Sequence, residues 1–213
     1  MSLPASAADG PQRADFNSER ASPEARHVAD WVAHSGDNHA GDARGLPFVI
    51  LDKTDARIYV FDAQGKLLAA APALLGLGIG DTSFEGIGER KLSTIRPADR
   101  TTPAGRFVGF VSKAFIQPKR AEDVLWVDYK GAVAIHRVVK GINRLQRLAT
   151  PTPADNRISF GCINVPVKFF DNVVLPAFKG TKGIIYVLPE TRPARDLFAS
   201  YDVEEYLRLK QKP

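Results

Sequence analysis

The chain has 213 residues, which suits one domain of ordinary size with a short appendage. Hydrophobic residues make up 44% of it, enough to build a core, yet no apolar run approaches the ~20 residues of a membrane-spanning helix. The formal net charge of +5 favours an anionic partner in general terms, but the sequence has no zinc spacing, recognition motif or aromatic RNA-binding signature, so we expect no nucleic-acid partner.

Residues 1–45 are polar and form the first predicted unit, an N-terminal segment with one short docked helix. The helix is predicted to begin at Pro23, because proline in the first turn with Glu24 beside it is typical of a helix start. Its apolar face contains Trp31, through which we expect it to dock on the main domain.

The small residues at positions 5–8, Ala-Ser-Ala-Ala, resemble the cleavage region of a signal peptide. The apolar stretch that normally precedes such a region is missing from the sequence. An unstructured Ala/Ser-rich terminus explains the same residues equally well, so these positions alone do not decide the compartment.

From Leu46 onward, short runs rich in β-branched and aromatic residues alternate with turn residues and predict strands. The predicted strands cover residues 48–51, 57–61, 66–71, 107–111, 124–128, 132–136 and 183–188. The first three are joined by tight turns and predict an antiparallel meander. A short helix is predicted over 169–174. We expect a main domain over 46–190 and a C-terminal helical tail over 191–213.

A basic amphipathic helix is predicted over residues 137–148, where cationic and apolar residues each recur at three- and four-residue steps. A solvated basic face is the simpler interpretation. The alternative is a lid whose cations bind carboxylates of a substrate. The cations concerned are Lys140, Arg144 and Arg147, and the apolar positions are Val138, Ile142, Leu145 and Leu148.

Cys162 is the only cysteine, so no disulfide can form within the chain. It lies in a tight Gly-containing segment, and His136 ends an apolar run 26 positions earlier. One cysteine with one well-placed histidine is the minimum set for a thiolate nucleophile and its base. The competing interpretation is a small buried cysteine and an unrelated strand-end histidine.

If the pair is catalytic, we expect His136 to hold a proton as imidazolium and so favour the thiolate of Cys162. A turn built on Gly161 can direct backbone N–H groups at the oxyanion that forms. Removing one such donor typically costs ~2.7–4 kcal/mol in barrier. The other histidines form no metal-spaced cluster, so no metal ligand is predicted.

His136 followed by Ser159-Phe160-Gly161-Cys162-Ile163-Asn164 resembles the signature of the L,D-transpeptidase catalytic domain (YkuD) family: a histidine, a spacer, then Ser/Thr-His-Gly-Cys-apolar-Asn. The segment Thr102-Pro103-Ala104-Gly105-Arg106-Phe107 resembles the family's Thr-Pro-x-Gly-x-Phe motif. The resemblance covers residues 46–190. It implies a mainly β fold, a mixed or antiparallel sandwich or barrel-like sheet with a few short helices.

The resemblance implies a bacterial enzyme of peptidoglycan biosynthesis, cell-wall organisation and cell shape. Cys162 would attack the third residue of a tetrapeptide stem and expel D-alanine, and an amine of another stem or of a lipoprotein would accept the acyl group. His136 would be the base, oriented by the carbonyl of Arg137. The nucleophile turn would be shaped by Ser159, Phe160, Gly161 and Asn164. No cofactor or metal is implied, and the expected location is the periplasm or cell envelope after export.

Two departures leave alternatives open. Phe160 stands where the family usually has histidine, and the spacer from His136 to Ser159 is 23 positions, longer than usual. The alternatives are a carboxypeptidase or cross-link hydrolase that uses water as acceptor, and a peptidoglycan-binding domain weakened in turnover. A sortase would need an arginine shortly after the cysteine strand, where Asn164-Val165-Pro166 stands. A basic domain without enzymatic activity is the remaining alternative.

Overall fold

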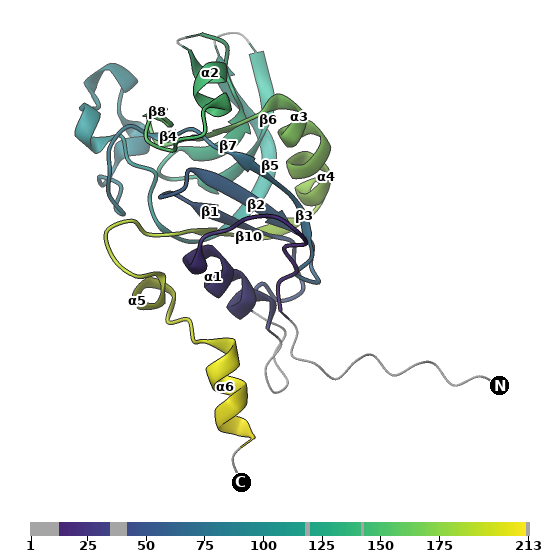
Figure 1. The fold of residues 1–213 in the computed structure, drawn as a ribbon. Coiled ribbons are helices and arrows are strands. Elements are labelled where there is room, and N and C mark those ends of the chain that lie inside the picture. Colours follow the sequence, from purple (N-terminus) through teal and green to yellow (C-terminus); the bar gives the residue numbers. More distant parts are fainter. Residues whose placement is uncertain (1–12, 35–41, 118–119, 142, 212–213) are drawn as a thin grey trace, which may run out of the picture.

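The structure is a computed structural model that describes residues 13–34, 42–117, 120–141 and 143–211. Within these ranges, eight strands form one mixed sheet in the order β3-β2-β1-β10-β5-β6-β7-β9 (Figure 1). Their bounds are β1 Phe48–Asp52, β2 Arg57–Phe61, β3 Leu67–Pro72, β5 Gly105–Gln117, β6 Arg120–Asp128, β7 Val133–Arg137, β9 Ile163–Val165 and β10 Lys182–Val187. The β1–β10 and β7–β9 pairs are parallel and the others antiparallel.

The two ends of this sheet are joined by backbone hydrogen bonds. Leu74, just after β3, donates its N–H to the Asn164 carbonyl of β9 at 2.8 Å, and Asn164 donates back at 2.9 Å. A short parallel pair, β4 (Leu75–Gly76) with β8 (Arg157–Ser159), continues from this junction. The sheet therefore curves until its edges meet, and the predicted mainly β, barrel-like fold is confirmed.

Strands β1, β2 and β10 are buried on both faces. Alternate residues enter two cores: Val49, Ile58 and Ile185 point into one, and Tyr59 and Tyr186 into the other. The first core is completed by the helical segment α3 (Val167–Phe169), a π turn (Phe170–Val174) and α4 (Leu175–Phe178). The predicted helix at 169–174 lies inside this segment.

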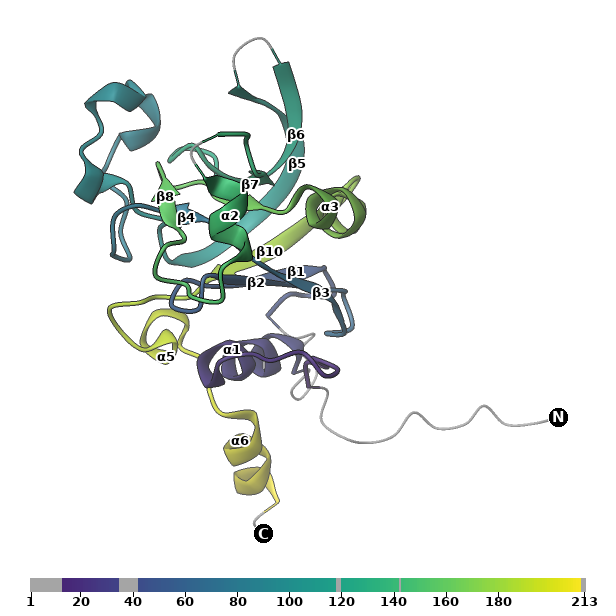
Figure 2. The same cartoon turned by 45° about the horizontal axis from the view of Figure 1, so that its top comes forward.

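Helix α1 (Pro23–Ala33) covers the other face beneath β1, β2 and β10 (Figures 1 and 2). The Ser22 side chain caps it by accepting from the Ala25 N–H at 3.0 Å, and the predicted start at Pro23 is confirmed. Trp31 is only half-buried and meets the ring of Tyr186 edge-on at a centroid distance of 6.1 Å. Docking therefore depends mainly on the small buried residues of the helix.

Short elements complete the described chain, and the residues at positions 5–8 lie outside it. Three 3-10 turns, Ile87–Glu89, Leu92–Thr94 and Pro97–Asp99, precede β5. After β10 come two helices, α5 (Ala194–Phe198) and α6 (Val203–Lys210). No helix in the described ranges has both the length and the apolar character needed to cross a membrane.

The helix predicted over 137–148 is wrong in its first half. Strand β7 runs through Arg137, and the Val138 N–H still donates to the Val165 carbonyl of β9 at 2.8 Å. Gly141 and Asn143 then adopt positive φ angles of 111° and 53°, and only α2 (Arg144–Ala149) is helical. Ile142 lies outside the described residues. The apolar and cationic residues of 137–148 recur with helical spacing, but hydrogen bonding to β9 holds the first of them in the sheet.

Candidate active site

The parallel pairing of β7 with β9 brings the histidine and the cysteine segment together. His136 lies opposite Asn164, and Ile135 lies opposite Ile163. Because side chains alternate along a strand, the two isoleucines enter the core while His136 and Asn164 face the other way. Cys162 is two residues before Asn164 and shares its face. Strand register thus joins groups that are 26 positions apart in the sequence.

The buried imidazole of His136 is held at both nitrogens. Nδ1 lies 2.7 Å from the Arg137 carbonyl oxygen, which can only accept, so Nδ1 carries the proton. Nε2 lies 3.3 Å from Nδ2 of Asn164. The amide is oriented by Arg144, whose Nη1 donates to Asn164 Oδ1 at 2.7 Å. The neutral tautomer therefore keeps its basic lone pair on Nε2.

The turn around Cys162 is fixed by its neighbours. Ser159 Oγ donates to the Cys162 carbonyl at 2.6 Å and accepts from the Gly161 N–H at 3.1 Å. Gly161 has φ +131°, and a Cβ there would lie 2.8 Å from the Thr101 carbonyl oxygen. This turn therefore requires glycine. The Cys162 thiol points to the Ala132 carbonyl oxygen, 3.5 Å from Sγ.

The electrostatics of the pair differ from the expectation. Burial lowers the pKa of His136 to about 4; the Arg137 carbonyl opposes this, and the charge of Arg144 adds to it. Burial also raises the pKa of the Cys162 thiol. Both charged forms lose solvation here, so at neutral pH the resting pair is a neutral thiol and a neutral imidazole. Burial of both groups therefore opposes the expected resting thiolate–imidazolium pair, which stays a prediction.

Cys162 and His136 line one cavity of about 550 Å³. The walls come from the nucleophile turn, from β5 and β6, from the 3-10 segment and from α2. Sequence reasoning missed two of these walls, the 3-10 segment and the β5–β6 hairpin. The local signal in the sequence was an apolar residue within a polar segment. Leu92 is such a residue, and its side chain is 59% exposed in the structure. The lining residues of these two walls are Ile87, Gly88, Arg90, Leu92, Ile95, Ala114, Phe115, Ile116 and Trp126.

The three cations proposed for substrate binding do not act together. Arg144 lines the cavity and contacts Asn164. Arg147 turns to the Asp155 carbonyl oxygen, to which its Nη1 donates. Lys140 is exposed and lies outside the lining residues. Of the three, only Arg144 is therefore placed to meet a ligand beside Cys162.

Two further predicted residues contribute differently. The carbonyl of Arg137 holds the imidazole, but its side chain points away: Nε donates to Asp171 at 2.7 Å, and the guanidinium lies 4.4 Å from the Phe170 ring centre. Phe160 lines the cavity, with the guanidinium of Arg100 4.1 Å from its ring centre. An aromatic–cation stack therefore occupies the position where the family usually has histidine.

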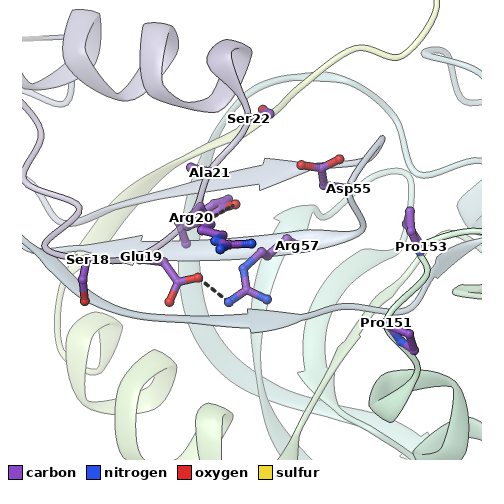
Figure 3. Close-up of a pocket in the computed structure, with 10 residues that line it drawn as sticks. Ser18, Glu19, Arg20, Ala21, Ser22, Asp55, Arg57, Pro151 and Pro153 are labelled. Atoms are coloured by element: carbon purple, nitrogen blue, oxygen red, sulfur yellow. Dashed lines mark hydrogen bonds and ion pairs between the residues drawn. The ribbon is translucent and has the colours of Figure 1, made fainter.

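A second cavity, of about 530 Å³, lies between residues 18–22, the start of β2 and the segment with Pro151 and Pro153 (Figure 3). Glu19 and Arg57 form an ion pair across it at 2.5 Å. It contains no cysteine or histidine, so the chemistry is expected at the Cys162 cavity. Within the described ranges, no three His, Cys, Asp or Glu side chains gather closely enough to hold a metal ion.

Comparison with known proteins returns similar folds only among solved structures, since no family model and no curated protein matches the chain. An L,D-transpeptidase in complex with imipenem is 20% identical, with 70% of this chain and 60% of that chain covered and a TM-score of 0.38. An L,D-transpeptidase from Mycobacterium smegmatis is 18% identical (66% and 58% covered, TM-score 0.38). The helical cell shape determining protein Pgp2 from Campylobacter jejuni is 18% identical (70% and 49% covered, TM-score 0.43).

The likeness concerns the fold alone. The chain spans between about half and three fifths of the length of these structures.

Proposed function

We propose that this chain is a cysteine-dependent L,D-transpeptidase that acts on peptidoglycan stem peptides. The observation that carries the proposal is the β7–β9 register, which aligns His136 with the segment of Cys162 on one face of the sheet. Both residues line the same cavity, and the Nδ1 contact with the Arg137 carbonyl leaves Nε2 of the imidazole unprotonated. Residues 46–190 would form the catalytic unit, with 191–213 as a helical tail.

In the proposed reaction, Cys162 Sγ attacks the carbonyl carbon of the third stem residue while its proton passes to His136 Nε2. Because the resting pair is neutral, this transfer accompanies attack rather than preceding it. The weak 3.3 Å contact between Nε2 and Asn164 has to yield when the proton arrives. The imidazolium then protonates the departing D-alanine amine as the C–N bond breaks, which leaves a thioester on Cys162.

The oxyanion of the tetrahedral intermediate needs backbone donors. The Gly161 N–H already donates to Ser159 within the turn, so the candidate donors are the N–H groups of Phe160 and Cys162. In the second half-reaction an amine attacks the thioester, His136 takes its proton, and the thiol is restored. The acceptor would be a second stem or a lipoprotein, and water as acceptor would make the protein a carboxypeptidase or cross-link hydrolase.

Arg144 is the proposed substrate-binding cation, since it lines the cavity and contacts the site through Asn164. A carboxylate of the stem peptide would complement its charge. The proposed location is the cell envelope, where this polymer lies.

A peptidoglycan-binding domain with weak turnover is the second candidate, favoured by Phe160 and by the neutral resting pair. The two functions are separated by incubating the protein with a carbapenem and with tetrapeptide muropeptides, then measuring protein and product masses. The transpeptidase predicts a covalent adduct that Cys162→Ala abolishes, with loss of D-alanine and formation of cross-linked products. His27→Ala, remote from the cavity, is the control. Muropeptide binding without adduct or product would refute the enzyme and support the binding domain.

A further inference from the structure

A buried lysine that the proposed reaction does not use contacts the segment containing Thr102. Lys53 is 1% exposed, and its Nζ donates to the Gly80 carbonyl at 2.6 Å, to Asp81 Oδ1 at 2.8 Å and to the Thr102 carbonyl at 3.1 Å. These three bonds use every hydrogen of the ammonium group. A buried charge is tolerated only when it is paired and hydrogen-bonded, so this lysine has a fixed position.

Lys53 belongs to an ion cluster that joins distant segments. Glu190, just after β10, lies 3.3 Å from Lys53 Nζ and also pairs with Arg157 of β8. Asp81 accepts from the backbone N–H groups of Glu190 at 2.8 Å and Thr191 at 3.0 Å. Two cations and two carboxylates balance one another. The cluster ties the end of β1, the loop after β4, strand β8 and the end of β10 into one rigid unit.

Thr102 connects this cluster to the nucleophile turn. Its side chain is fully buried, and its hydroxyl donates to the Gly161 carbonyl at 2.9 Å while accepting from the Gly76 N–H at 2.9 Å. Its own carbonyl accepts from Lys53. The Thr-Pro-x-Gly segment that the sequence singled out thus contacts the residue directly before Cys162.

The Gly161 carbonyl and the Cys162 N–H belong to the same peptide unit. That unit is planar and trans, so its C=O and N–H point in opposite directions. The Thr102 hydroxyl fixes the direction of the Gly161 carbonyl. It therefore also fixes the direction of the Cys162 N–H, which points the opposite way. We infer that Thr102, anchored by the Lys53 cluster, is a positioning residue that aims the Cys162 N–H as an oxyanion donor. The inference deepens the proposed function and rests on it for the reaction that the donor serves.

The test compares two reactions of the same thiol. Alkylation by iodoacetamide needs the thiol but no oxyanion donor. Acylation by p-nitrophenyl acetate needs both: the S–C bond forms, the acyl C–O bond breaks, and the thiol proton leaves with p-nitrophenol. The variant is Thr102→Val, which keeps the shape and removes the hydroxyl. Misplacing a donor lowers rates by about 10- to 100-fold, so we expect acylation to fall by that factor while alkylation stays within about two-fold.

Thr102→Ser keeps a hydroxyl and should restore acylation. Thr101→Val is the matched control, because it removes the neighbouring hydroxyl, which donates to the Thr82 carbonyl at 2.8 Å instead of to the turn. If Thr102→Val does not fold, as judged by its thermal transition, Thr102→Ala takes its place. The inference is overturned if the ratio of acylation to alkylation is unchanged, if Thr101→Val lowers it equally, or if Thr102→Ser fails to restore it.

The two proposals fail separately. A wild-type protein that forms the acetyl thioester but leaves muropeptides unchanged refutes the proposed substrate and leaves the role of Thr102 intact. Turnover of muropeptides that Thr102→Val does not slow overturns the role of Thr102 and leaves the proposed function. A wild-type thiol that is alkylated but never acylated by the ester overturns the inference.

Discussion

Replacing Asp81 by asparagine tests how far the buried ion cluster stabilises the fold. The Asp81 side chain is 6% exposed and 2.8 Å from Lys53 Nζ. Burial alone would raise the pKa of Asp81, but hydrogen bonds from Lys53, Thr191 and two backbone N–H groups outweigh it and lower the pKa from 3.8 to about 2. The folded protein therefore binds a proton less readily at Asp81 than the unfolded chain does.

This difference sets the sign and the size of the effect. Because folding lowers the pKa of Asp81, its carboxylate stabilises the folded state above about pH 4. This stabilisation is lost as the pH falls toward 2. The change from 3.8 to about 2 corresponds to about 2.4 kcal/mol in full. Wild type should lose about 1 kcal/mol more than Asp81→Asn between pH 5 and 3, and about 2 kcal/mol more between pH 5 and 2.

The assay is urea unfolding of both proteins at several pH values. Protonation of His136 in acid also lowers the free energy of unfolding, because burial lowers the pKa of this residue in the folded state. This contribution is common to both proteins and cancels in their difference. Asp99→Asn is the control, because Asp99 pairs with the exposed Arg96 and salt screens that pair. Parallel pH dependence of wild type and Asp81→Asn would refute the argument that Asp81 is stabilised as a carboxylate.

Three further outcomes are expected. The alkylation rate of Cys162 should rise with pH through 7 to 9 without a plateau between pH 5 and 8, because burial raises the thiol pKa; a plateau there would restore the thiolate–imidazolium pair. His136→Ala should lower acylation by a carbapenem by about 10²- to 10⁴-fold, measured by mass spectrometry, and an unchanged rate would remove His136 as the base. Arg144→Gln should weaken muropeptide affinity, measured by calorimetry, more than Arg147→Gln does, because Arg144 lines the cavity and Arg147 does not. Equal affinities of the two variants would contradict the assignment of Arg144 as the substrate-binding cation.

The local patterns in the sequence predicted most strands. The runs at 48–51 and 57–61 became β1 and β2, and 183–188 became β10 within a residue or two. Their alternation and turn residues are short-range properties that depend little on the rest of the chain. The helix predicted over 137–148 shows the limit of local patterns. Its apolar residues recur with helical spacing, but the Val138 N–H bonds to the Val165 carbonyl of a strand that is distant in the sequence.

Residue types and spacing alone predicted Cys162 and His136 as candidates, because a lone thiol and a strand-end imidazole carry chemistry wherever they lie. The tertiary structure decided the rest: the register that aligns them, the neutral state of the pair, and the separation of Arg144 from Arg147. It also placed Lys53 against the carbonyl of Thr102, whose hydroxyl contacts the turn. Desolvation and hydrogen-bond direction depend on segments that are distant in the chain, so no local pattern could specify them.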